Sequence, residues 1–229
     1  LPIYGCLTGS VALFSNPDFD SEIKRRIDYL LPKEYCLYKN ESPKCPQYLI
    51  VRNNKSSNIE GYIQKVIRLG LNELSIHKFI PESYKLGSLM QRLSLLRGLM
   101  DTDGCAIKNR IYYSTSSKKL AYDVVELVNS LGGIAKIHIY ERTNVNPEYR
   151  VGIRINMCPF TLSRKANEWS PTNVSRYISE AVRVEDEECV CIKVSSDDEL
   201  FITDNYIVTH NTTLALSAPK PLLLDFDNG

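Results

Sequence analysis

Hydrophobic residues recur at helical spacing through residues 88–104, which are the clearest element that the sequence predicts. Leucine and methionine return every three or four residues, so they form one apolar stripe along a helix. Ser88 is a candidate N-cap, and Gly104 ends the pattern as a helix-terminating glycine. The stripe consists of Leu89, Leu93, Leu96 and Met100.

Alternating hydrophobic and polar positions follow, and they predict two β-hairpins separated by a second helix. The first hairpin turns around residues 108–110, and an amphipathic helix over 118–131 ends at two glycines. Residues 134–141 and 148–156 alternate as the strands of the second hairpin. The order is helix, hairpin, helix, hairpin, and a short helix is expected over 159–169. Weaker patterns upstream predict a strand over 48–52 and a helix over 59–71.

The pattern changes near residue 175 and again at residue 212. Short β-type runs separated by acidic turns predict a separate all-β element. Its expected strands are 182–184, 189–194, 199–203 and 206–209. Residues 212–229 then combine a helix start, a Pro-Lys-Pro break and an apolar run typical of a buried parallel strand.

Composition places the chain among intracellular globular proteins. It has 229 residues, of which 43% are hydrophobic and 24% are charged, so disorder and a miniature disulfide scaffold are excluded. No apolar run approaches the roughly 18 residues that span a bilayer, and the first residues lack the basic flank of a signal peptide. We therefore expect a cytoplasmic protein without a membrane partner. Seven cysteines without a CxxC pair predict neither a zinc site nor a disulfide framework.

Charge is distributed unevenly, although the net charge is only +1. Counting Lys and Arg against Asp and Glu gives +3 for residues 1–89, +6 for 90–165 and −8 for 166–229. Aromatic residues are interleaved with the cations of the middle segment, which favours a polyanionic partner. An ordinary solvated face is the alternative on charge alone.

Residues 96–104, LRGLMDTDG, resemble the LAGLIDADG motif of the dodecapeptide (DOD-type) homing endonucleases. The similarity extends over about residues 80–170. It implies an α+β fold of two pseudo-symmetric helix-hairpin-helix-hairpin repeats, in which Gly98 lets two motif helices pack closely. Asp103 would be a catalytic carboxylate and ligand of Mg²⁺, and the strands would contact double-stranded DNA. The resemblance suggests five DNA contacts: Arg110, Lys136, Arg142, Arg150 and Arg154. For Lys136 an ordinary solvated lysine is an equal alternative.

A second copy of the motif is expected at the start of the chain, and it looks damaged. Residues 3–11, IYGCLTGSV, can be aligned so that Gly5 stands where Gly98 does and Ser10 stands where Asp103 does. A serine hydroxyl is a much weaker ligand for a hard cation than a carboxylate. We therefore expect DNA cleavage to be impaired.

Residues 189–213 resemble the C-terminal end of an intein. In that family Asn211 would cyclise and cut the main chain, His210 would donate a proton to the leaving amine, and Thr212 would be the downstream nucleophile. This autocatalytic splicing needs no cofactor. A histidine common in the family is replaced here by Glu199, so Glu199 or Asp198 is left to assist.

Residues 212–229 resemble the segment after Gly-Lys in a P-loop ATPase of the RecA-like or phage type. Thr212 would be the magnesium-binding hydroxyl of that host. The expected domains are 1–79 (degenerate first repeat), 80–174 (second repeat), 175–211 (splicing strands of a Hint fold) and 212–229 (C-extein). The N-terminal splicing block of an intein is not in this sequence, so splicing needs that upstream segment as a partner.

The sequence therefore predicts the downstream part of an intein that carries a LAGLIDADG endonuclease, with splicing and Mg²⁺-dependent DNA cleavage as its activities. Two alternatives remain open. One is a DNA-binding module that has lost catalysis, and the other is a free-standing nuclease with a passive acidic tail.

Overall fold

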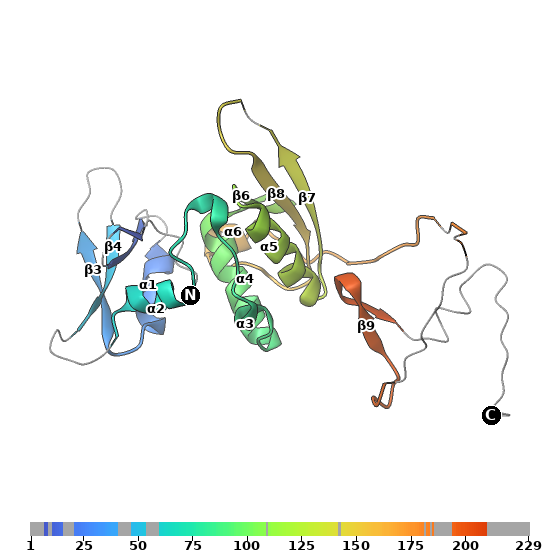
Figure 1. Cartoon of the computed structure of the whole chain (residues 1–229), viewed down its shortest axis with the longest axis horizontal. Helices are drawn as coiled ribbons and strands as arrows, with labels where there is room; N and C mark the ends of the chain where they lie inside the picture. Colours follow the sequence, from blue (N-terminus) through green and yellow to red (C-terminus); the bar gives the residue numbers. More distant parts are fainter. Residues whose placement is uncertain are drawn as a thin grey trace. The chain divides into compact units, whose positions relative to one another are not determined.

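The computed structural model divides the chain into two compact units, Leu1–Val174 and Ser175–Gly229 (Figure 1). No described helix is both long and apolar enough to cross a bilayer. The structure describes residues 7–8, 11–15, 21–40, 47–53, 60–108, 110–141, 143–180, 182–183, 185 and 194–209.

The first half of the larger unit contains a four-stranded antiparallel sheet and two helices. Its sheet has the order β1-β2-β4-β3. Buried residues of β3 and β4 pack with α1 and α2 into two small clusters, so one face of this sheet is covered. The elements are β1 (Leu7–Thr8), β2 (Val11–Ser15), α1 (Ser21–Leu30), β3 (Tyr35–Asn40), β4 (Gln47–Arg52) and α2 (Tyr62–Arg68).

The second half repeats this topology around a larger core. Its sheet has the order β5-β6-β8-β7, the same succession as in the first half. The predicted order of helix, hairpin, helix and hairpin is present here. The elements are α4 (Leu89–Asp103), β5 (Gly104–Ile107), β6 (Arg110–Thr115), α5 (Lys118–Ser130), β7 (Ile134–Tyr140), β8 (Glu148–Arg154) and α6 (Ser163–Ala166).

Local signals fix the ends of both long helices. Ser88 and Gln91 form a capping box at the start of α4, so the predicted N-cap is confirmed. At the end of α5, Gly132 adopts a φ of 76° and the Gly133 N–H donates to the Val128 carbonyl at 2.9 Å. This is a Schellman arrangement, in which a glycine in the left-handed region ends the helix.

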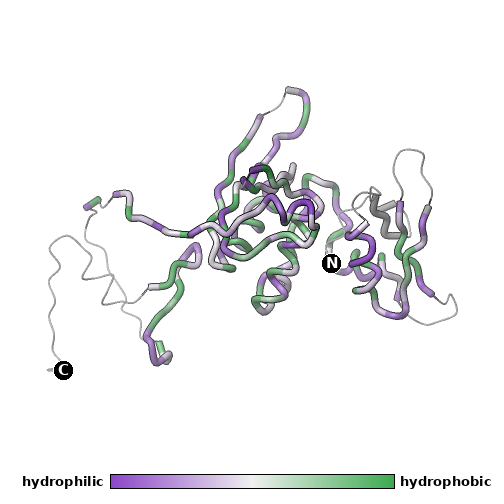
Figure 2. Tube along the Cα trace, turned by 180° about the vertical axis from the view of Figure 1, so that it is seen from behind, coloured by the Kyte–Doolittle hydropathy of each residue, from purple (hydrophilic) through white to green (hydrophobic). Residues whose placement is uncertain are grey.

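The core of the second half lies between α4, α5 and one face of the sheet. Leu96, Leu99 and Met100 of α4 are fully buried, as are Val124 and Val128 of α5. Figure 2 shows hydrophilic and hydrophobic positions alternating along the strands, as expected of a sheet with one covered face.

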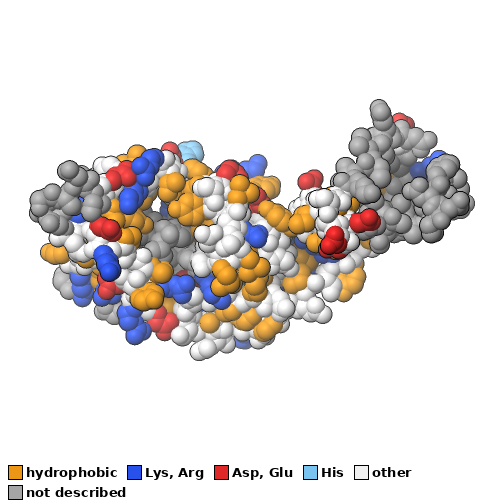
Figure 3. Space-filling model, turned by 90° about the horizontal axis from the view of Figure 1, so that it is seen from below, with side chains coloured by type: hydrophobic (Ala, Val, Ile, Leu, Met, Phe, Trp, Pro, Cys, Tyr) orange, Lys and Arg blue, Asp and Glu red, His pale blue; other side chains and the backbone are white. Residues whose placement is uncertain are grey.

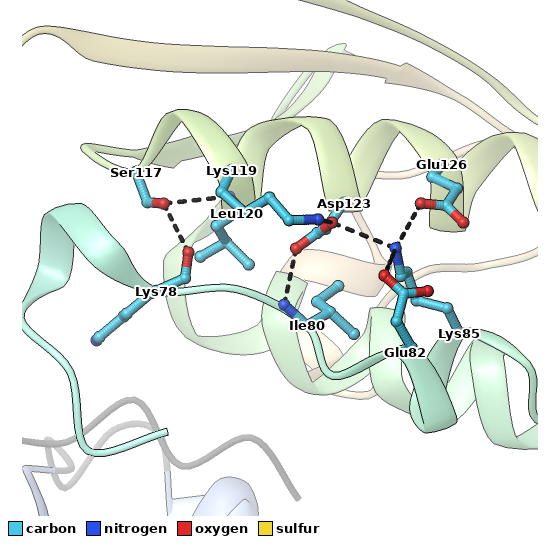
Figure 4. Close-up of polar contacts among 9 residues, drawn as sticks. All are labelled: Lys78, Ile80, Glu82, Lys85, Ser117, Lys119, Leu120, Asp123 and Glu126. Carbon is cyan, nitrogen blue, oxygen red and sulfur yellow. Dashed lines mark hydrogen bonds and ion pairs between the residues drawn. The ribbon is translucent and has the colours of Figure 1, made fainter. Parts of the chain in front are cut away.

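A polar network fastens the connector between the halves to α5 (Figure 4). The connector contains the short helices η2 (Ser75–His77) and α3 (Glu82–Lys85). Asp123 of α5 is 1% exposed; it accepts from the Ile80 N–H at 2.8 Å and from Lys119 Nζ at 2.6 Å. The buried Lys85 Nζ lies 2.7 Å from Glu126, 2.8 Å from Glu82 and 3.4 Å from Asp123. These ion pairs raise the pKa of Lys85, although burial alone would lower it.

The smaller unit contains one two-stranded hairpin among its described residues. Strands β9 (Phe201–Thr203) and β10 (Ile207–Thr209) pair across the 3-10 turn η3 (Asp204–Tyr206). Two of the expected strands are therefore present. Residues 182 and 183 are not in a strand, which is a correction to the expected strand over 182–184, and residues 189–193 lie outside the described residues.

Two predicted helices are shorter than expected. Residues 159–169 form a single turn, α6, because the preceding backbone is held extended by bonds to Asp101. The helix expected over 59–71 is α2, which begins after Gly61 and ends at Arg68.

Candidate nucleic-acid interface

Asp103 is the last residue of α4, and the chain enters β5 without a loop. A Cβ on the next residue, Gly104, would lie 2.5 Å from the Met100 carbonyl oxygen and 2.7 Å from the Met100 Cα. No real side chain tolerates such contacts, so glycine is required where the helix turns into the strand. The predicted helix end and its acidic residue are thus where the sequence pattern indicated.

The neighbouring acid, Asp101, has a structural task. Its side chain is buried and accepts hydrogen bonds from the Thr161 N–H at 2.9 Å, from the Leu162 N–H at 3.0 Å and from the Thr161 hydroxyl. These bonds hold the backbone that leads into α6. Of the two acids in the motif, Asp103 is therefore the one available for other ligands.

Lys165 of α6 caps the end of α4 from inside the protein. Its side chain is 6% exposed, and Nζ donates to the carbonyls of Gly104 at 2.6 Å, Asp101 at 2.7 Å and Met100 at 2.9 Å. A cation at a helix C-terminus also interacts favourably with the helix dipole. Sequence reasoning missed Lys165, because its partners lie more than sixty residues upstream.

The electrostatic surroundings of Asp103 are mixed. Partial desolvation raises the pKa of Asp103 above its ordinary value, while Lys78, Lys165 and a hydrogen bond from Thr102 act in the opposite direction. The side chain is still exposed, so it remains accessible to a cation from solvent. Lys136, which the sequence suggested as a DNA contact, is not among the groups that shift the pKa of Asp103.

The second sheet has one core-facing and one outward face. Alternate residues along β6, β7 and β8 pack against α4 and α5, which leaves their neighbours on the opposite side. The core-facing residues are Ile111, Tyr113, Ala135, Ile137, Val151 and Ile153. The outward cations are Arg110, Lys136, Arg150 and Arg154.

Four of the five suggested DNA contacts thus share one face, and the fifth, Arg142, lies outside the described residues. Among the residues of β6, β7 and β8, Glu148 is the acidic residue on this face. Elsewhere on the surface, cationic, acidic and hydrophobic side chains are interspersed, as on the face seen in Figure 3. The outward face of the second sheet therefore carries a local excess of positive charge that the chain as a whole lacks.

Arg150 is the most tightly held of these cations. Its guanidinium carbon lies 4.7 Å from the centre of the Tyr112 ring and 4.6 Å from that of Tyr140. Its Nη2 donates to Glu148 Oε1 at 2.9 Å, and this bond is the main reason that the pKa of Arg150 is raised. The Ser114 hydroxyl donates to the same carboxylate oxygen at 2.9 Å.

The first sheet presents a different outward face. Tyr48 and Ile50 of β4 are buried against α1 and α2, so Leu49 and Val51 lie on the other side. The neighbouring β2 has the sequence VALFS and contains no Lys or Arg. On β3, the residues paired with Val51 and Leu49 are Cys36 and Tyr38. Among the described strands of the first sheet, this face lacks the cations found on the second.

Strand register corrects the alignment of the first motif. Thr8 pairs with Val11 in the first hairpin as Ile107 pairs with Arg110 in the second. Leu7–Thr8 is thus a strand and not part of a motif helix that would end at residue 10. The alignment of Ser10 with Asp103 is therefore wrong. It rested on nine residues of sequence similarity, which carry no information about the register of the hairpin that follows.

Counting back from each pair gives the corrected correspondence. The residue four positions before Ile107 is Asp103, and the residue four positions before Thr8 is Tyr4. The following dipeptides agree as well, since Gly5-Cys6 matches Gly104-Cys105. Tyr4 and Ser10 themselves lie outside the described residues. In either alignment the first motif lacks the acid.

The described residues supply only part of a divalent-cation site. Asp103 provides one carboxylate of the kind that Mg²⁺ prefers. No group of three His, Cys, Asp or Glu side chains suited to a metal occurs in the described part of the chain. The donors seen at the end of α4 therefore fit half of a two-carboxylate site.

The proposed splicing residues His210, Asn211 and Thr212 lie outside the described residues, immediately after β10. Of the two acids suggested to assist them, Asp198 is held within its own turn. It accepts from the Leu200 N–H at 3.1 Å and from the Ser196 hydroxyl, and these bonds lower its pKa. Glu199 adopts a φ of 52° in the same turn.

Comparison with known protein families finds a match within the second half of the larger unit. Residues 90–158 match the family of LAGLIDADG-like domains. The replicative DNA helicase DnaB of Mycobacterium intracellulare is 31% identical over 153 residues, covering 61% of this chain and 27% of that protein. The chain thus spans about a quarter of the length of this curated relative.

Solved structures of the homing endonuclease I-DmoI are also similar. Its complex with DNA and Ca is 13% identical, with a TM-score of 0.46, and the match covers 69% of this chain and 81% of that chain. A structure of its mesophilic variants is 15% identical, with a TM-score of 0.42, over 62% of this chain and 72% of that one. Residues 90–158 of this protein are thus similar to the LAGLIDADG-like domains, and helix α4, which ends at Asp103, lies at the start of that segment.

Proposed function

We propose that the larger unit binds double-stranded DNA through the outward face of its second sheet. The observation that carries this proposal is the gathering of four cations on one face of β6, β7 and β8, inside the segment that matches the LAGLIDADG-like family. Lys and Arg side chains that neutralise phosphates supply most of the sequence-independent affinity for DNA. The outward face of the first sheet, whose described strands place no cation there, adds little, so the bound site is short and asymmetric.

Cleavage of the bound DNA is proposed to be weak. The second motif offers Asp103 as a ligand for Mg²⁺, whereas counting back along the sequence from the paired strands matches Asp103 with Tyr4 in the first motif. A neutral phenol does not replace a carboxylate as a ligand for a hard cation. The chain would bind DNA and at most nick it.

The first proposal is tested by measuring the binding of random duplex DNA with fluorescence anisotropy. Saturable binding that weakens steeply with salt is expected, and the absence of binding at low salt would refute it. For cleavage, Tyr4→Asp is expected to raise Mg²⁺-dependent nicking of a randomised plasmid library, and Ser10→Asp is the matched control that leaves it unchanged. A gain from Ser10→Asp alone would restore the first alignment.

We further propose that the smaller unit is the C-terminal splicing region of an intein. The hairpin of β9 and β10 leads directly into His210, Asn211 and Thr212, the residues with the chemistry for cyclisation and transfer. The helicase match supports an insert, because 153 aligned residues are far more than the 18 that follow Asn211. The similarity therefore includes much of the part before the C-extein.

Supplying an upstream intein segment in trans tests the splicing proposal. Mass spectrometry should detect a ligated product that ends in residues 212–229, and Asn211→Ala should abolish it. Failure to find either ligation or cleavage after Asn211 would leave the chain as a DNA-binding module without splicing activity. Cleavage of DNA without any peptide chemistry would favour a free-standing nuclease instead.

A further inference from the structure

Arg150 differs from the other outward cations because its guanidinium is immobilised on three sides. Tyr112 and Tyr140 stack on it at 4.7 and 4.6 Å, and Glu148 accepts from Nη2 at 2.9 Å and from Nε at 3.3 Å. Its side chain is nevertheless 34% exposed, so part of the group still faces solvent.

The hydrogen bonds to Glu148 use only one edge of the guanidinium. Among the described residues, Nε and one N–H of Nη2 are engaged by Glu148, which leaves the terminal edge formed by Nη1 and the second N–H of Nη2. Two parallel N–H groups on that edge match the O6 and N7 acceptors of guanine in the major groove. Stacking on two tyrosine rings fixes the plane of the fork, which a flexible surface arginine would have to order on binding.

Arg150 also differs from the other outward cations because it is paired with an acid. Glu148 neutralises it and is itself fixed by Ser114 at 2.9 Å, with only 13% of its side chain exposed. A neutralised arginine releases few counterions at a phosphate, so it is better suited to a base edge. The other three outward cations are exposed and form no ion pair within the described residues.

We propose that Arg150 is the base-reading residue of the second sheet and selects a guanine in the major groove, while Arg110, Lys136 and Arg154 contact phosphates. This inference rests on the proposed DNA-binding function. It assigns sequence discrimination to Arg150 and salt-dependent affinity to the three exposed cations.

Selection from a library of random duplexes tests the assignment with the full chain. The wild type should enrich one guanine by roughly 10-fold over the other bases, the discrimination of one bidentate pair. Arg150→Met should bind DNA but lose that preference, because a thioether donates no hydrogen bond to guanine. Arg154→Met is the matched control on the same strand and face, and it should keep the preference.

Glu148→Gln provides a second measurement that a merely structural role would not move. Removing the carboxylate should steepen the slope of log K against log salt by up to about 0.9, the value for one phosphate contact, because the unneutralised Arg150 can then attract a phosphate. An unchanged slope would contradict the neutralised state. If Arg150→Met enriches the same guanine as the wild type, the base-reading role is wrong although DNA binding stands. If the wild type retains no duplex, the proposed DNA-binding function itself fails.

Discussion

Replacing Lys165 with methionine probes how the end of α4 is built. The ammonium group is the shared donor for the carbonyls of Met100, Asp101 and Gly104, at 2.6–2.9 Å. Methionine has similar length and fills the same space, but it donates no hydrogen bond. The variant therefore removes the cap without leaving a large cavity.

The expected loss of stability follows from three contributions. Three buried carbonyls each lose a hydrogen bond worth about 1 kcal/mol or more, although the Met100 carbonyl keeps its bond from the Gly104 N–H. Loss of a cation at the helix C-terminus adds up to about 1 kcal/mol. The wild type bears the cost of burying an ammonium group, which is 6% exposed, and methionine avoids that cost, so part of the loss of stability is offset. We expect Lys165→Met to lower the free energy of unfolding by about 2–4 kcal/mol.

Urea unfolding followed by the fluorescence of Trp169 measures this change. Trp169 is the sole tryptophan and packs at the margin of the core of the second half, so its signal reports that region. Lys118→Met, at an exposed position of α5, is the control and should change stability by less than about 0.5 kcal/mol. If Lys165→Met is as stable as this control, the carbonyl cap contributes nothing and the reasoning is refuted.

Three further predictions concern the same half of the protein. Gly104→Ala should destabilise it by about 2 kcal/mol in the same urea experiment, because the new Cβ would displace the Met100 carbonyl, and an unchanged midpoint would contradict this. Asp123→Leu should cost about 3 kcal/mol by removing one partner of the buried Lys85, and a stability equal to the wild type would show that the other two acids suffice. Because the pKa of Asp103 is raised in the folded state, its ionisation opposes folding, so stability is lost as the pH rises from the ordinary carboxyl pKa through the raised one. Asp103→Asn should therefore be at least as stable as the wild type at neutral pH and should lose this advantage below the ordinary carboxyl pKa. A variant less stable than the wild type at neutral pH would contradict the direction of the pKa shift.

Features encoded by neighbouring residues could be predicted from the sequence. The helix expected over 88–104 is α4 within one residue, because the capping box at Ser88 and the glycine at 104 are local signals. The outward placement of Arg110, Lys136, Arg150 and Arg154 followed from strand alternation in the same way.

Features made by distant contacts could not be predicted. Lys165 and Asp101 act through partners about sixty residues away along the chain. The contact of Arg150 with Tyr112 and Tyr140 depends on the register of three strands, which single-strand periodicity does not determine. The misplacement of Ser10 has the same origin, since only the pairing of Thr8 with Val11 reveals the hairpin.

The salt dependence of duplex DNA binding tests the central proposal most directly. Fluorescence anisotropy with a random 40-mer duplex is compared between the wild type and the triple variant Arg110→Ala, Lys136→Ala and Arg154→Ala. Loss of three phosphate contacts should reduce the slope of log K against log salt by about 2.7 and weaken binding at low salt. Equal slopes and affinities for the two proteins would contradict the assignment of DNA binding to the outward face of the second sheet.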